Sequence, residues 1–117
     1  ADHLLRARAF RNRAWASYPG REAARWFADC SRAAAVARRS GLAADDDAVA
    51  LELELECATE SGRLETALRA WWQPAAAVDS DRRAWLGRRL ADSVIDRRFS
   101  VIGRCTRQQL TPLITDY

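Results

Sequence analysis

The segment from Arg21 to Ser40 constrains the fold most, because its apolar residues recur every three to four positions. Its arginines lie opposite that apolar face, within roughly 40° of one another at about 100° per residue. Gly41 follows, as glycine typically does just beyond a helix end. We therefore predict an amphipathic helix with one apolar and one basic face. The apolar positions are Ala23, Trp26, Phe27, Cys30, Ala33, Ala34 and Ala37, and the basic positions are Arg21, Arg25, Arg32 and Arg39.

Similar spacing predicts four more helices along the 117 residues. They cover about 3–18, 45–60, 64–73 and 81–104, with turn or breaker residues between them. A capping-box pattern at Thr106–Gln109 predicts a further short turn. The expected fold class is all-α, a compact bundle of five to six helices with short connections, in a single domain over residues 1–117.

Residues 49–57 are the ambiguous segment, because apolar and acidic residues alternate there with period two. That alternation is typical of a half-buried strand. Leu, Glu and Ala are strong helix formers, however, and no other segment supplies a partner strand. We expect a helix, and a strand is the alternative.

The charges are arranged in three blocks. Residues 1–44 hold nine Arg against three acidic residues, residues 45–65 hold eight acidic residues against Arg63, and residues 66–117 hold nine Arg against five Asp. All 19 basic residues are Arg. The acidic segment either docks on a basic helix of the same chain or meets the Arg face of a neighbouring copy. In the second case, Glu52 and Glu56 are candidate protein-interface residues.

The sequence argues against an enzyme. His3 is the one histidine, and no Ser–His–Asp, Cys–His or glycine-rich phosphate-binding pattern occurs. Glu56 and Glu60 lie four residues apart, but the Glu-x-x-His motif of helical di-metal sites is missing. We expect no catalytic residue, no metal, no cofactor and no small-molecule substrate.

Cysteine usage and hydropathy predict a cytoplasmic protein. Cys30, Cys57 and Cys105 are odd in number and widely spaced, so we expect reduced thiols that serve as core residues. No run of about 18 apolar residues exists, so we expect no membrane span. No signal peptide is visible at the start. A third hypothesis is that the chain is a helical regulatory domain of a longer polypeptide.

The arginines on one face of the predicted 21–40 helix, here called an Arg stripe, are the clearest functional signal. Arginines held on one helix face suit the phosphate backbone of RNA or DNA, because each contact releases counterions. The alternative is a solvated face, since any amphipathic helix in a lysine-free chain carries arginine on the side that faces solvent. A second stripe lies on the 81–104 helix, within roughly 80°. Its members are Arg82, Arg89, Arg97 and Arg104.

Trp72 is the candidate exposed aromatic residue. It follows Trp71 directly, and neighbours in a helix point about 100° apart, so both cannot face one core equally. An exposed Trp is typical of a contact with a protein partner, and base stacking is a second use.

Two families resemble parts of this chain. Residues 61–74 resemble the turn, second helix and closing Pro of a tetratricopeptide repeat, and residues 20–27 are similar to a weaker copy of it. That resemblance implies a protein–protein adaptor without nucleic-acid binding.

The size, the basic charge and the two Arg stripes together resemble the small helical subunit of CRISPR effector ribonucleoproteins. That resemblance implies a non-catalytic subunit that lines a guide–target channel and stacks with copies of itself and with other subunits. It is the leading hypothesis from the sequence, and the adaptor is its alternative.

Overall fold

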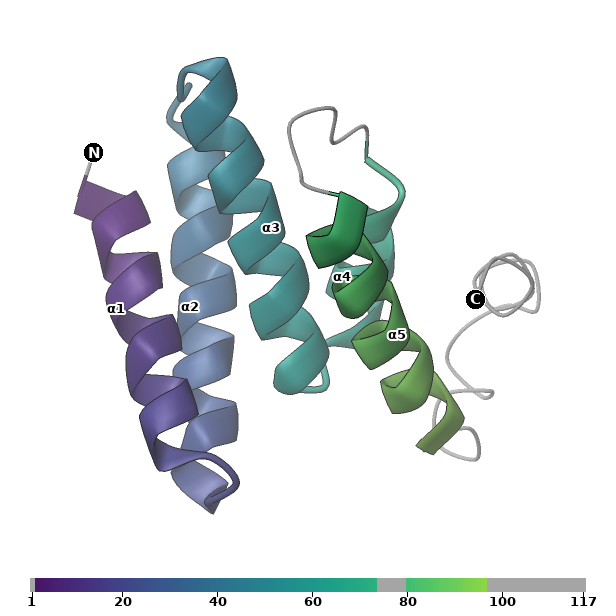
Figure 1. The fold of residues 1–117 in the computed structure, drawn as a ribbon. Helices are drawn as coiled ribbons and strands as arrows, with labels where there is room; N and C mark the ends of the chain where they lie inside the picture. The colour runs from purple at the N-terminus through teal and green to yellow at the C-terminus, as the bar shows by residue number, and fades with distance from the viewer. Residues whose placement is uncertain (1, 74–79, 97–117) are drawn as a thin grey trace.

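The computed structural model describes residues 2–73 and 80–96, which form five helices (Figure 1). They are α1 (Asp2–Ser17), α2 (Arg21–Arg39), α3 (Ala44–Glu60), α4 (Leu64–Trp71) and α5 (Ser80–Asp96). The all-α prediction is confirmed, and residues 49–57 lie inside α3 as helix. The expectations for Arg97, Arg104, Cys105 and Thr106–Gln109 fall outside the described residues.

Glycine ends two of these helices as the sequence predicts. Gly41 and Gly62 have φ angles of +85° and +78°, in the left-handed region that residues with a Cβ rarely adopt. At the other end of the intervening helix, Asp45–Asp47 occupy the first turn of α3, where the helix dipole favours negative charge. Short connections therefore follow α2 and α3 and turn the chain back on itself (Figure 1).

Helix α3 lies between two hydrophobic clusters and belongs to both. Ala50, Leu53 and Cys57 pack with α1 and α2 around Phe27. A second set on α3 packs with α4 and α5, and its members are Leu51, Leu55 and Ala58. A helix covered on two sides needs apolar residues on two faces. The period-two alternation of this segment therefore arises from a central helix and not from a strand.

Cys30 of α2 and Cys57 of α3 form a disulfide, with Cα atoms 5.9 Å apart. Both residues are fully buried. The expectation of reduced thiols is therefore wrong for this pair, although the expected core position is right. Sequence spacing gave no sign of it, because α2 and α3 bring together two residues that are 27 positions apart.

In the part of the chain that the structure describes, no helix is long and apolar enough to cross a membrane.

Candidate nucleic-acid interface

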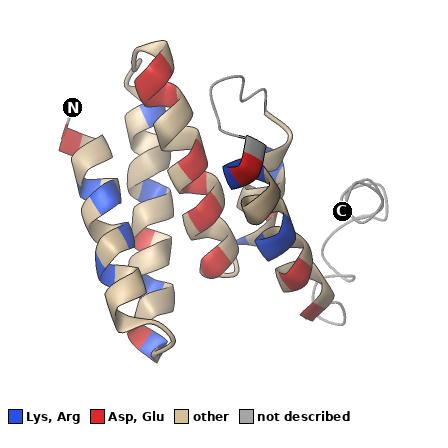
Figure 2. Cartoon of the chain, viewed as in Figure 1, with Lys and Arg blue, Asp and Glu red and all other residues tan. Residues whose placement is uncertain are grey.

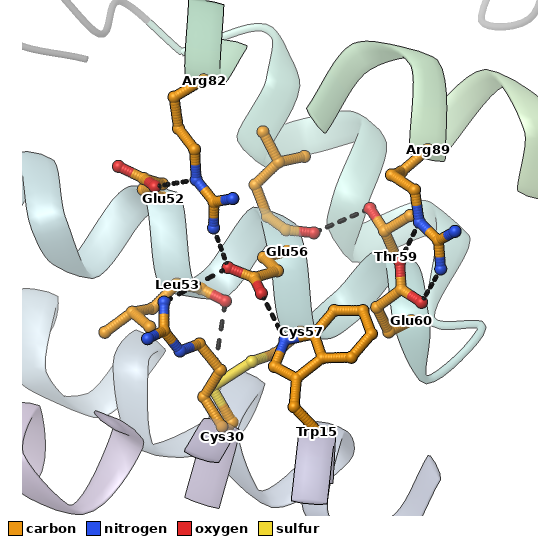
Figure 3. A network of polar contacts seen from close by, with 12 residues as sticks. Trp15, Cys30, Glu52, Leu53, Glu56, Cys57, Thr59, Glu60, Arg82 and Arg89 are labelled. Carbon is orange, nitrogen blue, oxygen red and sulfur yellow. Dashed lines mark hydrogen bonds and ion pairs between the residues drawn. A yellow bond between two sulfur atoms is a disulfide. The ribbon is translucent and has the colours of Figure 1, made fainter. Parts of the chain in front are cut away.

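The acidic face of α3 is paired with arginines of α5 (Figure 3). The Arg82 guanidinium donates to Glu52, with an Nε–Oε1 distance of 2.5 Å, and also to Glu56. Two turns further along α5, Arg89 donates from Nε and Nη2 to Glu60, with Nε 2.8 Å from Oε2. Helix α3 therefore docks on a basic helix of its own chain, the first of the two alternatives left open by the charge blocks.

Glu56 is the centre of these contacts. Its side chain is only 2% exposed, and it accepts a hydrogen bond from the Trp15 indole at 2.7 Å and a salt bridge from Arg11 at 3.7 Å. A carboxylate so enclosed cannot touch a partner, so the expectation that Glu56 is a protein-interface residue is wrong. Glu52 stays 27% exposed, but its charge is already met by Arg82.

The stripe on α5 consequently differs from the prediction. Arg82 and Arg89 are only about one-third exposed, and their guanidinium groups turn toward α3 (Figure 3). The hydrogen bond to Glu60 raises the pKa of Arg89 above its ordinary value. The helical wheel placed both residues on the polar side of α5, which we expected to face solvent, but gave no sign that an acidic helix covers that side.

Arg38 of α2 is a third internal cation, and sequence reasoning did not single it out. Its guanidinium lies 3.2 Å from Asp47 and 3.5 Å from Glu54, and it donates to the Gln73 amide oxygen at 2.6 Å. These contacts tie α2 to α3 and to Gln73, two residues beyond the end of α4. Arg38 lies off the predicted stripe by about a third of a turn, on the side of α2 that contacts α3.

The basic face of α1 and α2 remains after these pairs are formed. With Arg11 and Arg38 directed to α3, the two helices carry seven other arginines against Asp2, Glu22 and Asp29. Figure 2 shows basic residues along α1 and α2 and acidic residues along α3. The seven are Arg6, Arg8, Arg13, Arg21, Arg25, Arg32 and Arg39, and all are exposed. Arg8 lies about 200° around α1 from Arg6, so it does not share the side of α1 that carries Arg6 and Arg13.

The predicted α2 stripe lies on this face. Arg21, Arg25 and Arg39 make no ion pair with any residue that the structure describes, whereas Arg32 lies 3.2 Å from Asp29 on the same helix. Because both members of that pair are partly exposed, it contributes little to stability and opens at little cost. The stripe thus presents uncompensated positive charge to solvent.

The contribution of α1 was missed by sequence reasoning. Phe10 of α1 stacks on Trp26 of α2, with ring centroids 5.9 Å apart, and both rings are partly exposed. Arg13 lies over the Trp26 ring at 4.3 Å, and Arg25 lies 5.9 Å from its centroid. The signal was present in the sequence, because Arg6, Phe10 and Arg13 are spaced four and three residues apart and so share one side of α1.

Beside this aromatic pair, a hollow of about 410 Å³ opens between the two helices. Arg6 and Arg32 reach it from opposite helices, so the basic residues of α1 and α2 meet at one groove. The full lining is His3, Arg6, Phe10, Asp29, Arg32, Ala33 and Val36. We call the groove that holds this hollow and the Phe10–Trp26 pair the α1–α2 seam.

Trp72 directly follows α4 and does not belong to the α1–α2 seam. Its side chain is 50% exposed, as predicted, whereas Trp71 packs against the second hydrophobic cluster. The exposure is confirmed, and the contact with a partner stays a prediction.

Within residues 2–73 and 80–96, no group of three or more His, Cys, Asp or Glu side chains is arranged to hold a metal ion. Comparison of the chain with protein-family models, curated proteins and solved structures finds no match.

Proposed function

We propose that this chain is a non-catalytic helical subunit that binds a nucleic-acid backbone through the basic face of α1 and α2. One observation carries the proposal. The acidic face of α3 is met by Arg11, Arg38, Arg82 and Arg89, and the exposed arginines of α1 and α2 are left without a matching set of carboxylates.

The residue type and its placement on α2 both suit phosphate binding. A guanidinium binds phosphate with two parallel N–H donors, and each phosphate it neutralises releases a condensed counterion. Arg21, Arg25 and Arg32 lie on one side of a single helix, which suits contacts with successive phosphates of one strand. Such contacts read no bases, so binding is independent of sequence.

We extend the proposal to a larger ribonucleoprotein assembly. The resemblance to the small helical subunit of CRISPR effector complexes supports it through size, helical fold and basic charge. Such an assembly works in the cytoplasm, where disulfides are uncommon. The complete burial of Cys30 and Cys57 shields their disulfide from attack by free thiols.

The test is charge reversal on α2. The double variant Arg21→Glu/Arg25→Glu should bind labelled single-stranded RNA and duplex DNA at least tenfold more weakly than the natural chain at low salt, with an unchanged circular dichroism spectrum. The matched control is Arg69→Glu/Arg88→Glu, which reverses two exposed arginines on α4 and α5. Normal binding by the α2 variant would show that this face is not the interface.

A second candidate function, a helical protein–protein adaptor, is favoured by Trp72. An exposed Trp at a helix end is typical of an interface hot spot, for which truncation costs about 2 kcal/mol or more. Under this proposal, Trp72→Ala weakens a protein complex and leaves nucleic-acid binding unchanged. Isothermal titration of each variant, Trp72→Ala and Arg21→Glu/Arg25→Glu, against a purified protein partner separates the two functions. The adaptor function predicts weaker binding for Trp72→Ala only.

A further inference from the structure

The hollow in the α1–α2 seam is lined by both cationic and apolar side chains. Arg6 and Arg32 line it from opposite helices, and Phe10 lines it from α1. Ala33 and Val36 line it from α2. Its volume of about 410 Å³ lies within the range of ligand pockets, about 300–1,000 Å³.

The aromatic pair next to the hollow is held in place from both helices. Phe10 and Trp26 are inclined by only 22° to each other, and Arg13 lies over the Trp26 ring. Phe10 and Trp26 both pack against the hydrophobic cluster that contains the buried ring of Phe27. A platform fixed in this way loses little conformational freedom when a further flat group joins it.

We propose that the hollow of the α1–α2 seam receives an unpaired nucleobase of a single strand, stacked against Phe10, while Arg6 and Arg32 bind the phosphates on either side of it. This inference rests on the proposed function and adds the kind of strand that the surface selects. A base inside a duplex is covered on both faces by its neighbours, so only an unpaired base can enter.

The spacing of the arginines agrees with a strand running along the seam. Arg6 and Arg13 lie seven residues apart on α1, which corresponds to about 10 Å along a helix axis. That span covers about three steps of a stacked strand at roughly 3.4 Å each. Arg25 and Arg32 repeat the same interval on α2, so both rims of the seam carry charge at matching separations.

Asp29 is the one carboxylate in the lining, and it is paired with one of the two arginines there. It lies 3.2 Å from Arg32 and holds that guanidinium at the rim. Because the pair is partly exposed, a phosphate exchanges with Asp29 at little cost. Asp29→Asn is therefore expected to strengthen binding, by removing a like charge from the path of the strand.

The test compares two probes with the natural chain: a fluorescent twelve-nucleotide single strand of deoxythymidine, and an abasic strand of the same length and charge. Both carry the same phosphates, and only the first has bases. Base stacking predicts that the abasic strand binds at least about fivefold more weakly. A duplex of equal length is expected to bind more weakly than the single strand as well.

A pair of variants assigns the difference to the seam. Phe10→Leu keeps the apolar bulk but removes the ring, and it should abolish the preference for the strand with bases. Trp72→Leu makes the matched change at the exposed aromatic of α4 and should preserve that preference.

The outcomes distinguish this inference from the function on which it rests. Equal binding of the two probes by the natural chain would overturn the base-stacking site and leave backbone binding intact. Loss of the preference in Trp72→Leu, with Phe10→Leu unaffected, would place stacking elsewhere and overturn the site. Failure of both probes and the duplex to bind at low salt would overturn the proposed function itself.

Discussion

Trp15 donates its indole N–H to Glu56 over 2.7 Å, and this bond joins residues 41 positions apart in the chain. It crosses from α1 to α3 and ends on a carboxylate that also holds Arg82 of α5. A single buried side chain thus connects three helices. The same arrangement pairs the inward-facing carboxylates of α3 with arginines and leaves the other arginines of α1 and α2 exposed.

Removal of the Glu56 carboxylate should destabilise the fold strongly. In Glu56→Ala, the Trp15 N–H loses its acceptor, and Arg11 and Arg82 lose a shared counter-charge. Breaking a buried pair from one side costs about 3–5 kcal/mol; since both arginines are partly exposed, we expect about 3 kcal/mol. Urea unfolding followed by Trp fluorescence measures the change.

The matched control is Glu65→Ala, which removes an exposed carboxylate that lies 4.0 Å from Arg69. A surface pair of this kind contributes little, so the midpoint of unfolding should stay in place. Equal effects of the two substitutions would contradict the role given to Glu56.

The Cys30–Cys57 disulfide should contribute substantially to stability. It closes a loop of 27 residues, and the chain-entropy model then gives about 3–4 kcal/mol. Reduction of the denatured chain, followed by refolding under reducing conditions, should lower the free energy of unfolding by that amount. Alkylation of denatured but unreduced protein, read by mass spectrometry, should leave Cys30 and Cys57 unmodified; modification of both would contradict the pairing.

Gly87 should be intolerant of alanine, although alanine favours helices by about 1 kcal/mol. A Cβ at this position would lie 2.6 Å from Cη2 of Trp71, because α5 approaches α4 at this point. We expect Gly87→Ala to lower the free energy of unfolding by about 1–2 kcal/mol through this overlap.

A double-mutant cycle assigns the cause. In the background Trp71→Leu, which removes the overlapping ring, Gly87→Ala should be neutral or stabilising. A loss of the same size in both backgrounds would show that Trp71 is not what excludes the methyl group.

The sequence was sufficient for the helices and their order. Apolar spacing and the glycines after Ser40 and Ser61 placed most helix ends within one or two residues of those observed. For the segment 49–57 the alternation left a strand as the alternative, and the helix expected from its residue types is confirmed. A central helix needs two apolar faces, so it resembles an alternating strand locally, and the packing of Leu53 and Leu55 in different clusters explains the pattern.

The site was predictable only in part. Arg21, Arg25 and Arg39 depend on one amphipathic helix, and the helical wheel placed them correctly on its exposed face. Arg82 and Arg89 depend on which helix packs beside α5, and a wheel of one helix carries no such information. The pairing of Cys30 with Cys57 and the meeting of Phe10 with Trp26 are likewise contacts between helices.

The salt dependence of binding shows whether the exposed arginines of α1 and α2 bind nucleic-acid phosphates. Fluorescence anisotropy of a labelled single strand, titrated with the natural chain at several salt concentrations, gives the slope of log K against log salt. Four phosphate contacts predict a slope of about −3. The double variant Arg21→Glu/Arg25→Glu loses two phosphate contacts, so the magnitude of its slope should be smaller by at least about 1.4. A slope near zero, or no binding even at low salt, would contradict the account.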